Sequence, residues 1–256
     1  GVLQAAGPVG WRALAFRCLC LVILGSVRLM VDLNQRTPTA PLAQPLAKAL
    51  LLALPLCGWA FWDTTRAFLV LDTHSPVSCC AVVYSQVEGT VQSGGLLSLV
   101  DNLPPALTVG LLALVSALIL APLLTNRFSK TAPYLGLPLL MATTLWLPLA
   151  AAVLLTRFAP YHFEVLAHHC PWCLFLPEHG LVGYPLMGAF LTIGMEAPVP
   201  WMAHRLASAY PDCAEAAGRR IAKVVWRMGL ALAVFWGVGG LPALVWRLRY
   251  GVWIGG

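Results

Sequence analysis

ALTVGLLALVSALILAPLLT, residues 106–125, runs for 20 residues without a charged side chain. A helix rises about 1.5 Å per residue and the hydrocarbon core of a bilayer is about 30 Å thick, so a spanning helix needs about 20 apolar residues. A helix also satisfies its own backbone hydrogen bonds, which lipid cannot do. This stretch therefore predicts a membrane-spanning helix.

The composition of the whole chain supports the same interpretation. Of the 256 residues, 59% are apolar and only 10% are charged, and the mean hydropathy is +0.79. Soluble domains carry about 25% charged residues, because their surface must face water. This chain has too few polar residues to cover itself, so lipid must cover it.

Five further apolar runs of similar character complete the predicted fold. We expect an all-α integral membrane protein, a bundle of about six transmembrane helices with a moderately long extracytoplasmic loop. A single transmembrane domain would then occupy residues 1–256. The other five runs are 13–31, 45–62, 134–156, 173–197 and 224–246.

The loop charges predict the orientation of these helices. Lys and Arg lie in or beside the connections at about 32–44 (Arg28, Arg36 and Lys48), 126–133 and 198–223, whereas acidic residues predominate in those at about 63–105 and 157–180. The positive-inside rule makes the first three loops inner and the last two outer. It also explains the formal charge of +6 without a nucleic-acid partner. We expect a bacterial inner (plasma) membrane, with the outer loops in the periplasm.

This topology brings two cysteine clusters to the same side of the membrane. Cys79 and Cys80 lie in the first outer loop, and Cys170 and Cys173 lie in the second. The other thiols are expected to be unremarkable, either as small buried hydrophobes within apolar segments or as a reduced thiol on the inner side. They are Cys18, Cys20, Cys57 and Cys213.

The first functional hypothesis is thiol–disulfide exchange. A Cys-x-x-Cys at the start of a helix places two sulfurs within bridging distance, and the helix N-terminus favours the thiolate. His169, beside Cys170, would take the thiol proton or stabilise the thiolate when charged. Cys79 and Cys80 would then act as relay thiols for Cys170 and Cys173 by exchange.

A family resemblance points the same way. The order of loop cysteines, two membrane segments and a Cys-x-x-Cys opening a further segment resembles the vitamin K epoxide reductases and bacterial disulfide-forming quinone reductases. Ser78-Cys79-Cys80-Ala81-Val82-Val83-Tyr84-Ser85 is similar to that family's loop, which has a cysteine and, six positions later, a serine. The resemblance covers about residues 73–197. It implies a quinone as electron acceptor for Cys170 and Cys173, with the Cys79/Cys80 pair passing electrons on.

Two alternatives remain open from the residues. One is soft-metal binding or delivery, because thiolates and imidazoles suit copper(I) or zinc and adjacent cysteines suit one soft ion better than a bridge. Covalent haem is not expected, since Leu174 stands where the attachment motif needs histidine. The ligands of such a metal site would be His168, His169, Cys170, Cys173, Cys79 and Cys80.

The other alternative is a non-catalytic accessory subunit of a larger membrane complex, in which disulfides merely tether the loops. Besides lipid, the partners expected are a periplasmic thiol protein or other membrane subunits.

The polar residues of the fifth segment allow two local predictions. Pro177 and Gly180 indicate that the segment begins irregularly, with Glu178 and His179 facing outward as groups for proton transfer or a metal shell. Glu196 closes the segment, where we expect it to cap the helix or reach the membrane interface rather than to form a proton path.

Overall fold

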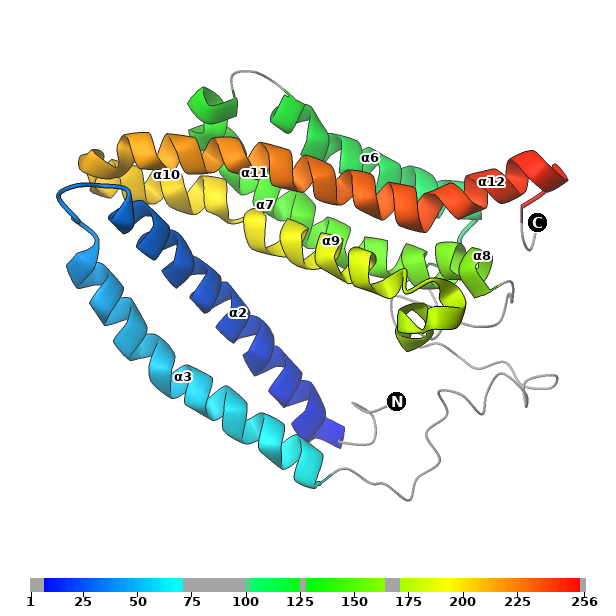
Figure 1. The fold of residues 1–256 in the computed structure, drawn as a ribbon, viewed down its shortest axis with the longest axis horizontal. Helices are drawn as coiled ribbons and strands as arrows, with labels where there is room; N and C mark the ends of the chain where they lie inside the picture. Colours follow the sequence, from blue (N-terminus) through cyan, green and yellow to red (C-terminus); the bar gives the residue numbers. More distant parts are fainter. Residues whose placement is uncertain (1–6, 71–99, 101, 125–127, 164–170, 254–256) are drawn as a thin grey trace. The chain divides into compact units, whose positions relative to one another are not determined.

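A computed structural model describes residues 7–70, 100, 102–124, 128–163 and 171–253 (Figure 1). Regular structure in these ranges is helical and includes no strand, which confirms the all-α class. Within the described ranges, four helices are long and apolar enough to cross a membrane, namely Pro8–Gln35, Ala43–Leu69, Gly136–Phe163 and Pro211–Tyr250. A shorter apolar helix covers Pro105–Ala121. Their length and composition indicate a membrane protein.

The described helices belong to two compact units. The first comprises Gly1–Ser85 and Met202–Arg220, and the second comprises Gln86–Trp201 and Ile221–Gly256. Helices α10 and α11 each contribute to both units. The first unit contains α2 (Gly7–Gln35), α3 (Ala43–Leu69), most of α10 (Val199–Ala209), the 3-10 turn η4 (Pro211–Cys213) and the start of α11 (Ala214–Val234).

The second unit holds the Cys-x-x-Cys segment and the aromatic core. Its helices are α6 (Pro105–Leu124), α7 (Phe128–Val153), α8 (Ala159–Phe163), α9 (Gly183–Glu196), the rest of α11, and α12 (Leu241–Tyr250). Two π-helices, η1 (Leu154–Phe158) and η5 (Phe235–Gly240), join α7 to α8 and α11 to α12. Two 3-10 turns, η2 (Pro171–Phe175) and η3 (Pro177–His179), precede α9.

Helices α2 and α3 form an antiparallel hairpin with small residues in its seam (Figure 1). Ala13, Cys20 and Val27 are buried at intervals of seven residues along α2, and Ala53 and Ala60 are buried at the same interval along α3. A seven-residue interval keeps one seam facing the partner helix. Small side chains in that seam let two helices approach closely in lipid, where no hydrophobic force drives them together.

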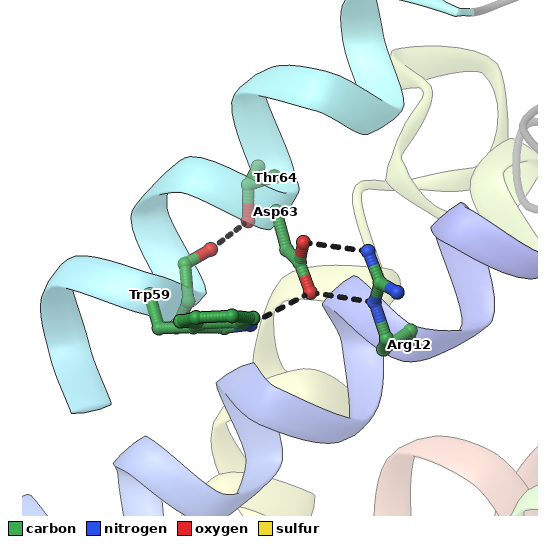
Figure 2. A network of polar contacts seen from close by, with 5 residues as sticks. Arg12, Trp59, Asp63 and Thr64 are labelled. Carbon is green, nitrogen blue, oxygen red and sulfur yellow. Dashed lines mark hydrogen bonds and ion pairs between the residues drawn. The ribbon is translucent and has the colours of Figure 1, made fainter.

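A buried ion pair joins the hairpin near its open end (Figure 2). Arg12 donates from Nε and Nη2 to the two carboxylate oxygens of Asp63, each at 2.8 Å. Trp59 Nε1 also donates to Asp63 at 3.3 Å. The Asp63 side chain is 0% exposed and that of Arg12 is 47% exposed. The carboxylate is therefore compensated inside the hairpin, while the guanidinium extends to the surface.

Removal of the Asp63 charge should destabilise the hairpin, because asparagine offers Arg12 one acceptor oxygen in place of two and carries no charge to pair with the guanidinium. We expect Asp63→Asn to lower the Tm of the detergent-solubilised protein by about 5 °C, as breaking one partner of a buried pair does. The double variant Arg12→Met/Asp63→Leu should recover most of that loss. Glu215→Gln is the matched control, because Glu215 forms an exposed ion pair with Arg219 and should change the Tm little. An unchanged Tm in Asp63→Asn would contradict the role of this pair.

At its closed end the hairpin contacts the connection between α10 and α11. Thr39 Oγ1 donates to Asp212 at 2.8 Å, and Thr37 Oγ1 lies 3.7 Å from the sulfur of Cys213. Cys213 is fully buried. These contacts bring together the first and third loops that the sequence predicts to be inner, as expected if both face the same side of the membrane.

The core of the second unit is aromatic and organised around one hydroxyl. Ser116 Oγ accepts hydrogen bonds from Trp146 Nε1 at 2.8 Å and from Trp236 Nε1 at 3.2 Å, and donates to the carbonyl oxygen of Leu112 at 2.8 Å. Trp146 is fully buried and packs edge-on against Phe235, with ring centroids 4.9 Å apart. A buried indole needs an acceptor, and this serine supplies one for two indoles from different helices.

The two π-helices contact each other across this core. The ring of Phe158 in η1 lies 6.2 Å from that of Phe235 and 5.8 Å from that of Trp236, both in η5. A Cβ placed on Gly239 would lie 3.4 Å from the Phe158 ring. Gly239 and Gly240 therefore allow the close packing of η5 against Phe158.

Candidate functional site

Of the six residues predicted to carry the chemistry, the structure describes Cys173. It lies in η2 and is half-buried, and the next residue, Leu174, is buried. The remaining five lie outside the described residues, so their predicted roles remain predictions. They are Cys79, Cys80, His168, His169 and Cys170.

The segment after Cys173 begins irregularly, as Pro177 and Gly180 predict. Gly180 has φ +70° and Leu181 has φ +56°, and the Leu181 N–H donates to the carbonyl oxygen of Leu176 at 3.2 Å. The structure differs from the expectation that the Cys-x-x-Cys opens a long helix, because α9 begins only at Gly183. Cys173 therefore lies in a five-residue 3-10 turn, and the dipole of a long helix is not available to its thiol.

A close approach at Gly183 holds this turn against α9. A Cβ on Gly183 would lie 2.7 Å from Cγ of Phe175, closer than real Cβ contacts occur. The Phe175 ring also packs edge-on against Tyr184, with centroids 5.0 Å apart, and lies 6.1 Å from the ring of Trp172. Only glycine at this position lets the Phe175 ring seat the turn that carries Cys173.

Gly183→Ala should dislodge the turn, because the added methyl group and the Phe175 ring cannot occupy the same space. We expect a Tm lower by about 5 °C, typical of overpacking, and faster alkylation of Cys173 by a water-soluble maleimide. Gly188→Ala, also in α9, is the matched control. Its Cβ would meet nothing within 4 Å, so stability should stay equal or rise slightly. Equal alkylation rates in the two variants would contradict the seating role of Gly183.

Arg157, in η1, joins the described ends of the two predicted outer loops. One of its terminal nitrogens, Nη2, donates to the carbonyl oxygens of Val100 at 2.8 Å and of Leu103 at 2.9 Å. Val100 and Leu103 lie at the end of the first outer loop, just before α6, and Arg157 lies where the second was predicted to begin. The helix continues beyond this point, through α8 to Phe163. The contact brings the two loop stems to one end of the second unit.

Replacement of Arg157 should loosen the start of α6. We expect Arg157→Gln to speed amide hydrogen exchange over residues 102–108 at least about tenfold, because two backbone carbonyls lose a charged donor. Arg157→Lys should be intermediate, since an ammonium keeps the charge but lacks the planar fork. The control is Arg249→Gln, whose guanidinium lies over the exposed Tyr250 ring in α12 and should leave exchange at α6 unchanged. Unchanged exchange in Arg157→Gln would contradict this contact.

Two histidines lie in the short segments around the Cys173 turn. His162 Nε2 lies 3.1 Å from the carbonyl oxygen of Val238 in η5. A carbonyl only accepts, so Nε2 carries the proton and Nδ1 keeps its lone pair when the ring is neutral. His179 of η3 packs edge-on against Phe163, with centroids 4.7 Å apart. Since α8 also contacts η2, both imidazoles belong to the end of the unit that holds Cys173.

Glu196 differs from its predicted role as a cap or an interfacial group. Its side chain is only 8% exposed and accepts a hydrogen bond of 2.8 Å from Arg227 in α11, whose side chain is 47% exposed. The pair joins the end of α9 to α11 within the second unit. No contact was predicted for Arg157 or Arg227 from the sequence. An isolated arginine in an apolar helix does, however, indicate a specific partner for its charge.

Within the described residues, no group of three or more His, Cys, Asp or Glu side chains lies close enough to hold a metal ion. This does not test the predicted metal site, because five of its six ligands lie outside those residues. Comparisons with protein-family models, curated proteins and solved structures found no match to the chain.

Proposed function

We propose that this chain is a membrane thiol–disulfide oxidoreductase with a bundle of six transmembrane helices. In this proposal Cys170 and Cys173 are the exchanging pair, Cys79 and Cys80 are the relay thiols, and His169 is the base. The electron acceptor is a membrane quinone, as the resemblance to vitamin K epoxide reductases and bacterial disulfide-forming quinone reductases implies. The thiols face the periplasm from a bacterial inner membrane, where a periplasmic thiol protein would supply electrons.

The observation that carries the proposal is the contact of Arg157 with the carbonyls of Val100 and Leu103. A relay between two loops requires both loops to leave the same end of the molecule. The two stems are hydrogen-bonded to each other at one end of one compact unit, which supports a common location for the loops that carry the cysteines.

The surroundings of Cys173 also suit a quinone. Trp172, Phe175 and Tyr184 form a strip of aromatic rings beside it, and the side chains of Trp172 and Tyr184 are exposed. Aromatic faces stack on a planar ring, and an exposed strip on a membrane protein is accessible to a lipid-soluble molecule. A bound quinone would accept two electrons and two protons while two thiols become a disulfide.

The histidines can carry the protons that this reaction transfers. Each pair of thiols that forms a bridge releases two protons, and imidazole is the side chain best able to carry them near neutral pH. His162 offers Nδ1 as the accepting atom, because Nε2 is committed to Val238. His179 lies in the neighbouring turn and would extend the path toward water.

The test is quinone reduction by the full chain in liposomes, with a dithiol as electron donor. Wild type should reduce a short-chain benzoquinone, and Cys170→Ser and Cys173→Ser should each lower the rate at least about 100-fold, because a disulfide cannot form from one thiol. Cys18→Ser, which removes an exposed thiol of α2, should leave the rate unchanged.

Metal analysis and thiol trapping of the same preparation give the contradicting outcomes. Stoichiometric copper or zinc with Cys79, Cys80, Cys170 and Cys173 all alkylatable would replace the proposal with a soft-metal site. A bridge that resists reductant, in a chain that copurifies with other subunits, would replace it with a tether in an accessory subunit.

A further inference from the structure

We propose that Cys20 and Cys57 form a second dithiol, inside the α2–α3 hairpin, which a lipid-soluble quinone oxidises to a disulfide. The sequence suggests only that both are small buried hydrophobes. This pair lies in the first unit and does not involve the loop cysteines, so the proposal is independent of the function proposed above.

The geometry places the two thiols across the seam from each other. Cys20 is 8% exposed, at the middle of the buried stripe of α2. Its Sγ lies 3.7 Å from the carbonyl oxygen of Leu56, the residue that precedes Cys57 in α3. A disulfide requires Cα atoms about 4.4–6.8 Å apart, and the small residues Ala53 and Ala60 on either side favour such an approach.

Contacts on both sides fix the register that makes this pairing. Toward the open end, Phe16 packs on Trp59, with ring centroids 6.3 Å apart. Beyond it, Arg12 holds Asp63 by two hydrogen bonds. The contacts of Arg12, Phe16 and Cys20, spaced four residues apart along α2, thus fall on Asp63, Trp59 and Leu56, spaced four and three residues apart along the antiparallel helix α3.

At the closed end, Asn34 Oδ1 accepts a hydrogen bond of 2.8 Å from the backbone N–H of Leu42. A hairpin anchored at both ends cannot slide, so Cys20 stays opposite Leu56 and Cys57. The pairing is therefore a constant feature of the hairpin.

Accessibility determines which oxidant reaches the pair. Cys57 is half-buried within a segment of membrane-spanning character, and Cys20 is behind it in the seam. A quinone dissolved in lipid can approach Cys57 from the outside of the hairpin, whereas charged oxidants in water cannot. The two S–H bonds break, one S–S bond forms, and the two electrons and two protons pass to the quinone, which leaves as the hydroquinone. The product is a hairpin with a covalent bond between its helices.

The experiment uses the full chain with Cys79, Cys80, Cys170 and Cys173 all replaced by serine, reconstituted in liposomes with a lipid-soluble benzoquinone. Free thiols are then alkylated and the peptides are analysed by mass spectrometry without reduction. We expect a linked peptide pair containing Cys20 and Cys57, and one hydroquinone per chain. Both should disappear in Cys20→Ser and in Cys57→Ser. Both the linked peptides and the hydroquinone should persist in Cys18→Ser, because Cys18 is on the exposed face of α2 and Cys20 is in its buried seam.

Two results would overturn the inference: full alkylation of Cys20 and Cys57 after quinone treatment of the folded protein, or a bridge that uses Cys18 instead. If the fourfold variant does not fold, the same linked peptides are sought in quinone-treated wild type, where their absence again overturns it. The loop cysteines are absent from the first experiment, so its failure and the failure of the proposed function are separate outcomes.

Discussion

The cost of an uncompensated charge in hydrocarbon is the constraint on which this structure depends. Two buried carboxylates, Asp63 and Glu196, each accept hydrogen bonds from an arginine of another helix, Arg12 and Arg227 respectively. In both pairs the arginine is about half exposed and the carboxylate almost completely buried. A long arginine side chain can bring its charge from the surface to a fixed acid, so the ion pair determines which helix packs beside which.

Polar contacts also join segments that lie far apart in the sequence. Thr39 and Asp212 connect the closed end of the hairpin to the connection between α10 and α11. Arg157 connects the stem of one predicted outer loop to that of the other. In each case both partners come from loops predicted to share a side of the membrane.

The spanning helices could be predicted from the sequence because their signal is local. Length and lack of charge suffice to predict a helix at 106–125, where α6 forms, and Pro177 and Gly180 suffice for the irregular start of the fifth segment. Partners in space have no such signal. Asp63 and Arg157 were assigned to the edges of outer loops, whereas the helices continue to Leu69 and Phe163 and the two side chains make helix-to-helix or helix-to-loop contacts. The choice between Cys20 as a hydrophobe and Cys20 as half of a dithiol likewise required the register of α3.

The π-helices are the feature that the sequence signalled least and that most affects the site. A π-turn widens the helix by one residue per turn and releases carbonyl groups from their usual partners. Val238, within η5, uses its carbonyl to accept a hydrogen bond from His162, and η1 carries Arg157. Both widened turns therefore place polar groups near the end of the unit that bears Cys173. A regular helix would rotate Arg157 by about 100° for each residue removed, turning it away from Val100 and Leu103.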